Sequence, residues 1–174
     1  MSLYGVREII AVDSRGIIGD ARTDLNSEKK ALLEFVDRDK TGTMEDAIAG
    51  ADIFIGVSKG GLLTQAHIQS MAANPIVFAL ANPIPEIMPD QAKHAGVAVI
   101  ATGRSDFPNQ VNNSLAFPGI FRGALDNGVQ KITDQHKIAA AEALAALVDN
   151  PTADQVIPSP FDERVVPAVS AVIK

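Results

Sequence analysis

The sequence predicts an α/β protein built on a doubly wound parallel sheet. Four short apolar stretches alternate with stretches of helical periodicity along the 174 residues, and this alternation is typical of parallel strands joined by helical crossovers. Polar, glycine-rich or proline-rich residues follow each apolar stretch. Because ligands of open α/β sheets bind beyond the carboxyl ends of the strands, we expect a binding site among these residues.

The four expected strands are apolar stretches bounded by turn residues. They lie at residues 7–13, 51–58, 75–81 and 96–103. The first ends on Asp13. The other three consist mainly of Ile, Val, Phe, Leu, Ala and Gly, as strands that are buried on both faces do.

The helices in the first half of the chain are marked by their capping residues. Helical patterns are expected at residues 27–39, at 43–50 and within 61–72. Asn26 or Ser27 is expected to cap the first helix. Thr43 and Asp46 form an acidic variant of the capping box for the second, and Thr64 caps the third.

The helices in the second half have equally clear boundaries. They are expected at residues 89–94, 118–127, 134–149 and about 161–172. Pro89 and Pro118 suit the first helical position. Gly128 is a stop signal, and Thr133 is an N-cap. The stretch 149–160 is expected to cross the surface and dock the last helix.

The composition is that of a globular protein, and it argues against several functional classes. Hydrophobic residues make up 47% and charged residues 21% of the sequence, which suits one domain of this length. The 15 basic and 21 acidic residues give a net charge of −6, which disfavours nucleic-acid binding. The absence of cysteine excludes disulfides and thiolate sites. Without a membrane span or an export signal, we expect a cytoplasmic protein.

Two residues that follow the first strands are candidates for nucleotide binding. An acid such as Asp13 at the end of a strand can accept hydrogen bonds from the adenosine ribose hydroxyls. The glycine-rich phosphate turn belongs about 20 residues before such an acid. Only twelve residues precede Asp13, so either the acid merely caps a turn or the phosphate turn lies outside this chain. Ser58 faces a nucleotide or caps a turn, and Gly60 and Gly61 allow close backbone approach.

Carboxamides follow the last two strands. Pro83 holds Asn82 outside helical geometry, which fixes a donor and an acceptor suited to a ribose, a carboxamide or a carboxylate. The stretch PNQVNN at 108–113 contains four more carboxamides directly before a predicted helix N-terminus. Neutral amides beside such a helix end can hold a carboxylate without a counter-charge. The alternatives are an Asn-Pro turn and a solvated loop.

Five stretches of the sequence resemble the cofactor-binding domain of bacterial-type malic enzymes. They read YGVREIIAVDSRGII, GADIFIGVSKGGLLT, IVFALANPIPEIMPDQAK, VIATGRSDFPNQVNNSLAFPGIFRGALD and IPSPFDERVVPAVSAVIK. The resemblance covers residues 4–174 and implies a Rossmann-like NAD(P)-binding domain, with residues 1–3 as a cloning remnant. Malic enzymes oxidise L-malate with NAD or NADP and decarboxylate it to pyruvate and CO₂, with Mg²⁺ or Mn²⁺ as the metal.

The resemblance also implies roles for five residues. Asp13 matches the acid that binds the adenosine ribose, and Ser58 lines the dinucleotide. Asn82 matches an asparagine near both the nicotinamide ribose and the substrate. Asn113 is expected to contact a carboxylate of malate, while Asn112 faces the nicotinamide end. We expect NAD because the charge of Asp13 repels a 2′-phosphate, although Arg15, two residues later, could accommodate the 2′-phosphate of NADP.

The departures from the family limit what the chain is expected to do alone. In malic enzymes a substrate domain precedes this region and carries a catalytic Lys, a catalytic Tyr and acidic metal ligands. Their counterparts are not found here, so no catalytic residue and no metal ligand is assigned. We therefore expect the chain alone to be inactive with malate. The alternative is a non-catalytic nucleotide-binding or interaction module derived from a Rossmann dehydrogenase.

The resemblance further implies that the first strand of the sheet and the glycine-rich turn lie upstream of this chain. Loss of a central strand exposes two edges within the sheet. Three outcomes are then open. Residues 9–12 could pair directly with residues 77–80, a second copy could fill the edge, or the chain could fold poorly. We expect the second of these, a homo-oligomer.

Overall fold

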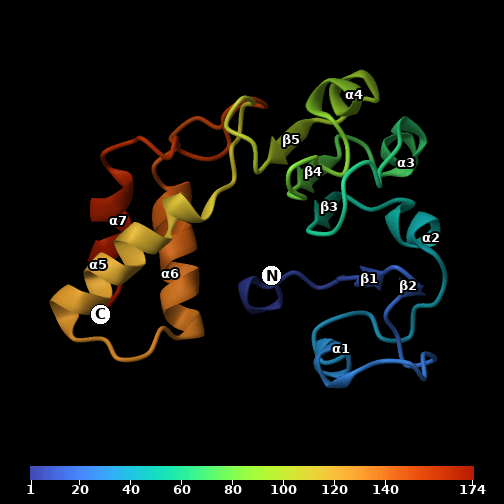
Figure 1. The fold of residues 1–174 in the computed structure, drawn as a ribbon, viewed down its shortest axis with the longest axis horizontal. Coiled ribbons are helices and arrows are strands. Elements are labelled where there is room, and N and C mark those ends of the chain that lie inside the picture. Colours follow the sequence, from blue (N-terminus) through green and yellow to red (C-terminus); the bar gives the residue numbers. More distant parts are fainter. The chain divides into compact units, whose positions relative to one another are not determined.

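The computed structural model describes all 174 residues, and they form two compact units (Figure 1). The first unit comprises residues 1–51 and 70–72. The second comprises residues 52–69 and 73–174. None of the helices is both long enough and apolar enough to cross a membrane.

The first unit contains short elements only. They are the 3-10 turn η1 (Ser2–Tyr4), the strands β1 (Val12–Asp13) and β2 (Gly16–Ile17), and the helices α1 (Ser27–Leu32) and α2 (Met44–Ile48). The two strands form a tight antiparallel hairpin. Helix capping is as predicted: the Asn26 side chain accepts the Lys29 N–H at 2.9 Å, and Thr43 and Asp46 form a capping box.

The prediction of a strand over residues 7–13 is wrong for most of its length. Only its last two residues lie in β1, and they pair with β2 rather than with a parallel neighbour. The carbonyl of Ile9 instead accepts the Asp37 N–H at 2.7 Å, and that of Ala11 accepts the Ile18 N–H at 2.8 Å. The apolar pattern is present, but a strand also needs a partner strand for its backbone groups.

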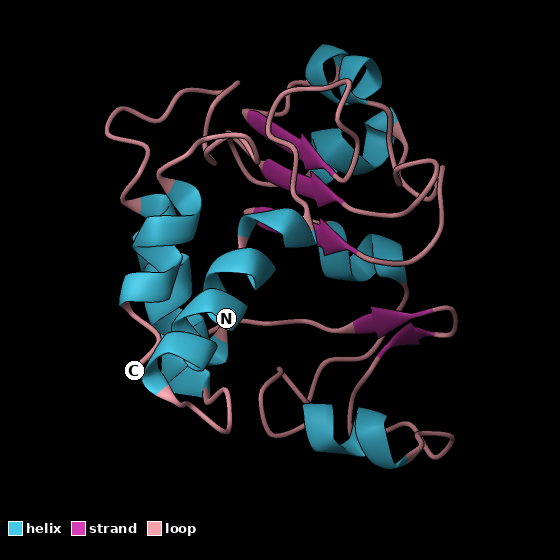
Figure 2. Ribbon diagram, turned by 60° about the vertical axis from the view of Figure 1, so that its left-hand side comes forward, coloured by secondary structure: helices cyan, strands magenta, loops and turns pink.

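The second unit contains a three-stranded parallel sheet, formed by three of the four predicted strands (Figure 2). Its strands are β3 (Ile53–Gly56), β4 (Ile76–Ala79) and β5 (Val99–Thr102). Helix α3 (Gln65–Ser70) lies on the crossover from β3 to β4, and α4 (Pro89–His94) lies on the crossover from β4 to β5. The order β3-β4-β5 places β4 in the middle.

This strand order rules out one expected way of closing the sheet. Residues 77–80 cannot pair with residues 9–12, because β3 and β5 occupy both edges of β4. The outer edge of β3, on the side away from β4, has no partner strand. Along β3 the side chains of Ile53 and Ile55, and Val57 directly after it, are exposed by 49%, 44% and 79%.

Three longer helices complete the second unit. They are α5 (Phe117–Asn127), which follows the 3-10 turn η2 (Asn113–Leu115), α6 (Asp134–Ala145) and α7 (Val165–Ala171). Gly128 ends α5 in the left-handed conformation, and Thr133 caps α6, as predicted. Helix α6 ends earlier, and α7 begins later, than the sequence pattern indicated.

Helix α5 packs closely against α7 because two of its glycines face that helix. A Cβ atom on Gly119 would lie 2.5 Å from the Cβ of Val169, and one on Gly123 would lie 2.6 Å from the carbonyl oxygen of Ser170. Around this contact Ala140, Val169 and Ile173 form a buried cluster. A side chain at position 119 or 123 would therefore force the two helices apart.

Candidate functional site

The carboxyl ends of β3 and β4 bring two of the predicted residues to the same edge of the sheet. Ser58 follows β3, Asn82 follows β4, and both side chains are exposed. The Asn82 amide lies beside Gly103, the first residue after β5: a Cβ atom on that glycine would meet the Asn82 Nδ2 atom at 3.3 Å. A hydroxyl and a carboxamide thus stand at the edge where α/β sheets bind their ligands.

Glu86 connects the loops that carry these two residues. Its side chain is fully buried; Oε1 accepts the Ser58 N–H at 3.0 Å, and Oε2 accepts the Ala81 N–H at 3.0 Å. Its carbonyl also accepts the Leu63 N–H at 2.9 Å. Sequence reasoning missed this residue. The available signal was a single acid between Pro85 and Ile87, in a stretch otherwise made of apolar residues and prolines.

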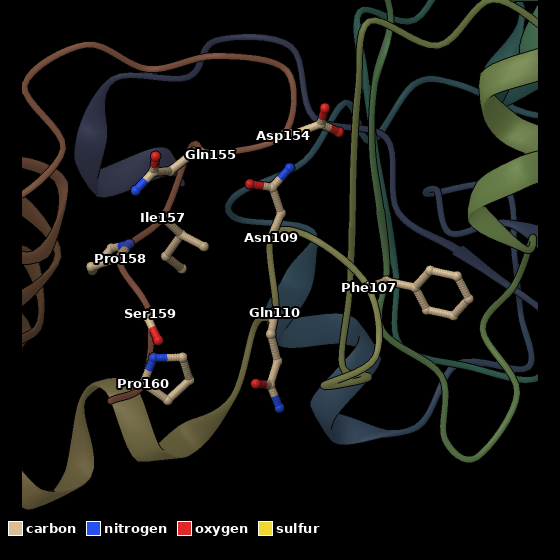
Figure 3. A pocket seen from close by; sticks show the side chains of 9 residues that line it. All are labelled: Phe107, Asn109, Gln110, Asp154, Gln155, Ile157, Pro158, Ser159 and Pro160. Atoms are coloured by element: carbon tan, nitrogen blue, oxygen red, sulfur yellow. The ribbon is translucent and has the colours of Figure 1, made fainter. Parts of the chain in front are cut away.

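The carboxamides of the PNQVNN stretch divide into a structural and an exposed group. Asn109 is buried; its Nδ2 donates to the carbonyls of Ile100 (3.1 Å) and Ala153 (2.8 Å), and its Oδ1 accepts the Val156 N–H at 2.8 Å. It therefore fastens the stretch 152–156 to β5. Figure 3 shows its amide directed toward the segment that carries Asp154.

The exposed carboxamides are the pair that the sequence assigned to ligand binding. Asn112 caps η2, its Oδ1 accepting the Ser114 N–H at 2.9 Å, and Asn113 is the first residue of that turn. Both side chains are exposed. Helix α5 begins four residues after Asn113, at Phe117. The geometry is consistent with amides that meet a ligand near a helix N-terminus.

A hollow of about 280 Å³ lies beside this region (Figure 3). It is formed by the loop after β5 and the proline-rich stretch before α7, and its lining comprises Phe107, Asn109, Gln110, Asp154, Gln155, Ile157, Pro158, Ser159 and Pro160. Asn82, Asn112 and Asn113 do not line it. The candidate binding residues thus lie on an open edge rather than inside this hollow.

Asp13, in the first unit, lies in a network of ion pairs. Arg22 donates to both carboxylate oxygens, at 2.7 and 3.1 Å, Lys29 donates to Oδ2, and the Arg15 N–H donates to Oδ1 at 2.8 Å. The side chains of Asp13 and Arg22 are each only 14% exposed. A carboxylate has about four acceptor sites, so a ribose hydroxyl could bind Asp13 only by displacing one of these donors.

The same contacts determine the charge state of Asp13. The hydrogen bonds from Arg22, supported by those from Lys29 and the Arg15 backbone, hold the pKa of Asp13 well below its ordinary value, while burial opposes them. Arg22 lowers the pKa of Asp24 in the same way. Both carboxylates are therefore charged at neutral pH, and both help to hold the loop after β2.

We expect acid to weaken the first unit through Asp13. Because the pKa of Asp13 is lower in the folded state than in the unfolded chain, where it is about 3.9, the ion pairs stabilise the fold fully only at pH values well above the unfolded pKa. Their stabilisation is lost as the pH falls below about 5. The Asp13→Asn variant should have a lower urea midpoint near neutral pH and a flatter decline between about pH 6 and pH 3.

The control for this measurement is Asp126→Asn, which removes a carboxylate from an exposed pair on α5. It should leave the pH dependence close to that of the unchanged protein, because exposed pairs contribute little. An Asp13→Asn variant with an unchanged pH dependence would show that the network does not stabilise the fold.

Neutral polar groups lie at the carboxyl edge of the sheet and in the loop after β5. Ser58, Asn82 and Asn112 present hydroxyl and amide groups of the kind that bind ribose and carboxamide, and Gly103 leaves the end of β5 without a side chain. A parallel sheet with helical crossovers is the architecture of a Rossmann-like domain, whose ligands bind beyond the carboxyl ends of the strands.

Comparison with known proteins identifies the family. The family model "Malic enzyme, NAD binding domain" matches residues 5–172, so the chain belongs to that family, as the sequence resemblance indicated. The bifunctional malic/malolactic enzyme of Bacillus subtilis is 55% identical over 98% of this chain and 42% of its own length. The NAD-dependent malic enzyme of Geobacillus stearothermophilus is 49% identical, over 95% of this chain and 35% of its own length.

Solved structures support the same assignment of the fold. The crystal structure of NAD-dependent malic enzyme from Thermotoga maritima matches 99% of this chain with a TM-score of 0.93 and 42% sequence identity. Entamoeba histolytica malic enzyme matches 94% of it with a TM-score of 0.89 and 39% identity. The chain covers 46% and 36% of these two proteins. It thus spans less than half the length of the relatives named here.

Proposed function

We propose that this chain is the cofactor-binding part of an NAD(P)-dependent malic enzyme, whose parent protein converts L-malate to pyruvate and CO₂ by oxidative decarboxylation. The observation that carries the proposal is the pair Ser58 and Asn82 at the carboxyl edge of the sheet, in a chain of the malic enzyme family. Relatives are named as malic enzymes dependent on NAD and on NADP. When bound, the dinucleotide supplies the hydride acceptor.

The residues of this chain bind and orient in the proposed function. Ser58 and Asn82 hydrogen-bond the ribose and nicotinamide part of the dinucleotide, and Asn112 contacts the nicotinamide end. Asn82 also reaches the substrate, and Asn113 donates to a carboxylate of malate. A neutral amide suits both tasks because it offers a donor and an acceptor without fixing a charge. No residue of this chain is assigned a proton-transfer role.

Asp13, in the first unit, is proposed to accept hydrogen bonds from an adenosine ribose. Lys29 is the side-chain donor most easily displaced from it, since it is 37% exposed whereas Arg22 is 14% exposed. The carboxylate favours NAD over NADP by repelling a 2′-phosphate. Arg15, 70% exposed and paired with Asp24, is the residue that would accommodate that phosphate instead.

The rest of the parent enzyme is proposed to supply the chemistry. It comprises a substrate domain with the proton-transfer groups and the ligands of a Mg²⁺ or Mn²⁺ ion, none of which we assign to this chain. The parent is proposed to be cytoplasmic and homo-oligomeric. In this chain alone the outer edge of β3 has no partner strand, which supports association with a second copy through an added strand.

Titration with NADH, followed by its own fluorescence, tests cofactor binding directly. We expect the chain to bind NADH and Asn82→Ala to weaken binding by about tenfold, the value of one hydrogen bond of roughly 1.4 kcal/mol. Gln130→Ala, which removes an exposed carboxamide between α5 and α6, should bind as the unchanged chain does. A chain that binds neither NADH nor NADPH would overturn the proposal for these residues.

The same preparation should form no NADH from L-malate and NAD⁺ in the presence of Mg²⁺. Binding without turnover is the result expected both for a cofactor-binding part and for a non-catalytic nucleotide-binding module, the alternative function. Weaker binding of malate or pyruvate by Asn113→Ala, in the presence of NADH, would distinguish the first from the second. A metal-dependent rate of NADH formation by the purified chain would contradict the assignment of the chemistry to the rest of the parent.

A further inference from the structure

We propose that Glu86 is a positioning residue that holds Ser58 and Asn82 in place at the carboxyl edge of the sheet. We call this edge, defined by these two residues, the cofactor edge. Glu86 touches no candidate ligand. It acts through the Glu86 bridge, by which we mean the hydrogen bonds from the N–H groups of Ser58 and Ala81 to its carboxylate. The inference rests on the proposed function for the cofactor itself, whereas the bridge is a property of the fold.

The bridge joins the loops after β3 and β4 just beyond the point where the pairing of these two strands ends. The last paired residues of β3 and β4 are Gly56 and Ala79, and the Leu80 N–H still donates to the Gly56 carbonyl at 2.9 Å. One residue further on, the Ala81 N–H donates to the Glu86 carboxylate, which also accepts the Ser58 N–H. The carboxylate therefore ties the two loops to one buried point.

Backbone contacts on either side show that the two loops are joined along their length. The Gly61 N–H donates to the Pro85 carbonyl at 3.0 Å, and the Leu63 N–H donates to the Glu86 carbonyl at 2.9 Å. Gly60 is packed so closely that a Cβ atom on it would lie 2.7 Å from the Ile84 carbonyl oxygen. The position of Ser58 thus depends on the loop that contains Asn82.

The Glu86 carboxyl group packs against Gly56, where only a residue without a side chain leaves room for it. A Cβ atom on Gly56 would lie 2.5 Å from the Cδ and Oε1 atoms of Glu86, so the carboxyl group rests directly on the end of β3. No buried side-chain polar atom in the structure lacks a hydrogen-bond partner. The glutamate is accordingly held in one orientation by packing below it and two N–H donors around it.

The bridge needs a carboxylate rather than an amide. Each of its two oxygens accepts a backbone N–H, Oε1 that of Ser58 and Oε2 that of Ala81. A glutamine would keep one acceptor but turn an NH₂ group toward the other N–H. Glu86→Gln therefore changes no volume and still breaks half of the bridge, which makes it the sharpest variant.

The loss of the hydrogen bond in Glu86→Gln should reach Asn82 through the single peptide unit that joins it to Ala81. Ala81 directly precedes Asn82, whose amide is placed beside Gly103. Releasing the Ala81 N–H frees the backbone that aims this amide, and releasing the Ser58 N–H does the same for the hydroxyl. Two contacts to the dinucleotide then loosen together, although neither side chain has been changed.

The test compares Glu86→Gln with two controls in the NADH titration. We expect Glu86→Gln to raise the NADH dissociation constant by about tenfold, on the scale of one hydrogen bond. Glu142→Gln makes the same chemical change at an exposed position on α6 and should bind normally. Val169→Ala weakens the buried cluster of α6 and α7 and should lower thermal stability without this loss of binding.

A double-mutant cycle separates positioning from general destabilisation. If Glu86 acts by aiming Asn82, then Asn82→Ala should cost little further binding once Glu86→Gln is present, because the contact is already lost. Independent effects, which multiply in the double variant, would overturn the proposed route through Asn82. So would a Glu86→Gln variant that binds NADH as tightly as the unchanged chain.

Hydrogen exchange tests the bridge without any cofactor. The amides of Ser58 and Ala81 lie outside the strands, so their slow exchange in the unchanged protein requires the glutamate, and Glu86→Gln should accelerate both by about tenfold or more. If the variant fails to fold, the unchanged chain alone decides, since rapid exchange at these two amides would overturn the bridge. Failure of that chain to bind NADH while both amides stay protected would count against the proposed function alone.

Discussion

Replacing Asn109 with alanine should lower the free energy of unfolding of the second unit by about 4 kcal/mol. Its side chain makes three hydrogen bonds at a buried position, and such bonds contribute about 1 kcal/mol each. Its backbone is left-handed, with φ of 55°, a conformation that costs alanine roughly 1 kcal/mol more. Urea unfolding followed by far-ultraviolet circular dichroism measures the sum.

A pair of glycine variants separates the two contributions. Asn109→Gly accepts the left-handed backbone, so it should lose only the hydrogen bonds, about 3 kcal/mol. Asn74 has nearly the same φ, 59°, but is exposed, and Asn74→Gly should change stability by only a few tenths of a kcal/mol. A loss below about 1 kcal/mol for Asn109→Gly would show that the stretch 152–156 is held by other contacts.

Replacing Gly119 with valine should be the most damaging change in the helical part of the second unit. A Cβ atom there would lie 2.5 Å from the Cβ of Val169 and 3.2 Å from the Val166 carbonyl oxygen. Neither atom is the free end of a flexible side chain, so α5 and α7 must separate. Overpacking of a core usually costs about 1–3 kcal/mol, and we expect about 3 kcal/mol or more here because a helix backbone must move.

The matched control is Leu125→Val in the same helix. Leu125 is 82% exposed, so its valine variant introduces the same β-branched side chain without a clash and should cost about 0.5 kcal/mol in helix propensity. Gly119→Ala is the milder form of the test. Alanine favours the helix by about 1 kcal/mol over glycine, so a stabilised Gly119→Ala variant would contradict the close packing of α5 on α7.

The sheet could be predicted from the sequence because its signals are local. Buried parallel strands are continuous apolar stretches, and three of the four predicted ones form β3, β4 and β5. Capping boxes and glycine stops also act within a few residues, so Thr43, Thr133 and Gly128 were assigned correctly. The first strand could not be predicted this way, because whether residues 7–13 pair depends on a neighbouring strand that is not encoded within that stretch.

The candidate site was predictable only in part, for the same physical reason. The polar residues after strands identify an edge, so Ser58, Asn82 and the exposed asparagines could be named from the sequence. Their roles in binding stay predictions. The residues that hold the edge in place act over long separations: Glu86 reaches Ser58 across 28 positions, and Asn109 reaches Val156 across 47. A propensity or a periodicity carries no information about such partners.

The sequence identified Asp13 as a candidate binding residue but did not reveal its ion-pair partners. The pattern of an acid at the end of a strand pointed to a ribose ligand. The structure shows that Arg22, in the loop after β2, and Lys29, in α1, already occupy its oxygens. Counting the charges in that loop would have suggested ion pairs, but not which cation meets which carboxylate.

The contact between Gly56 and Glu86 also limits how this sequence can change over generations. Any side chain at position 56 would collide with the carboxyl group, and any shorter or uncharged residue at position 86 would leave the two loop N–H groups without their shared acceptor. A substitution at position 56 or at position 86 alone should therefore be selected against. A homologue that carries alanine at position 56 should therefore carry a different solution at position 86, and the two replacements should be inherited as a pair.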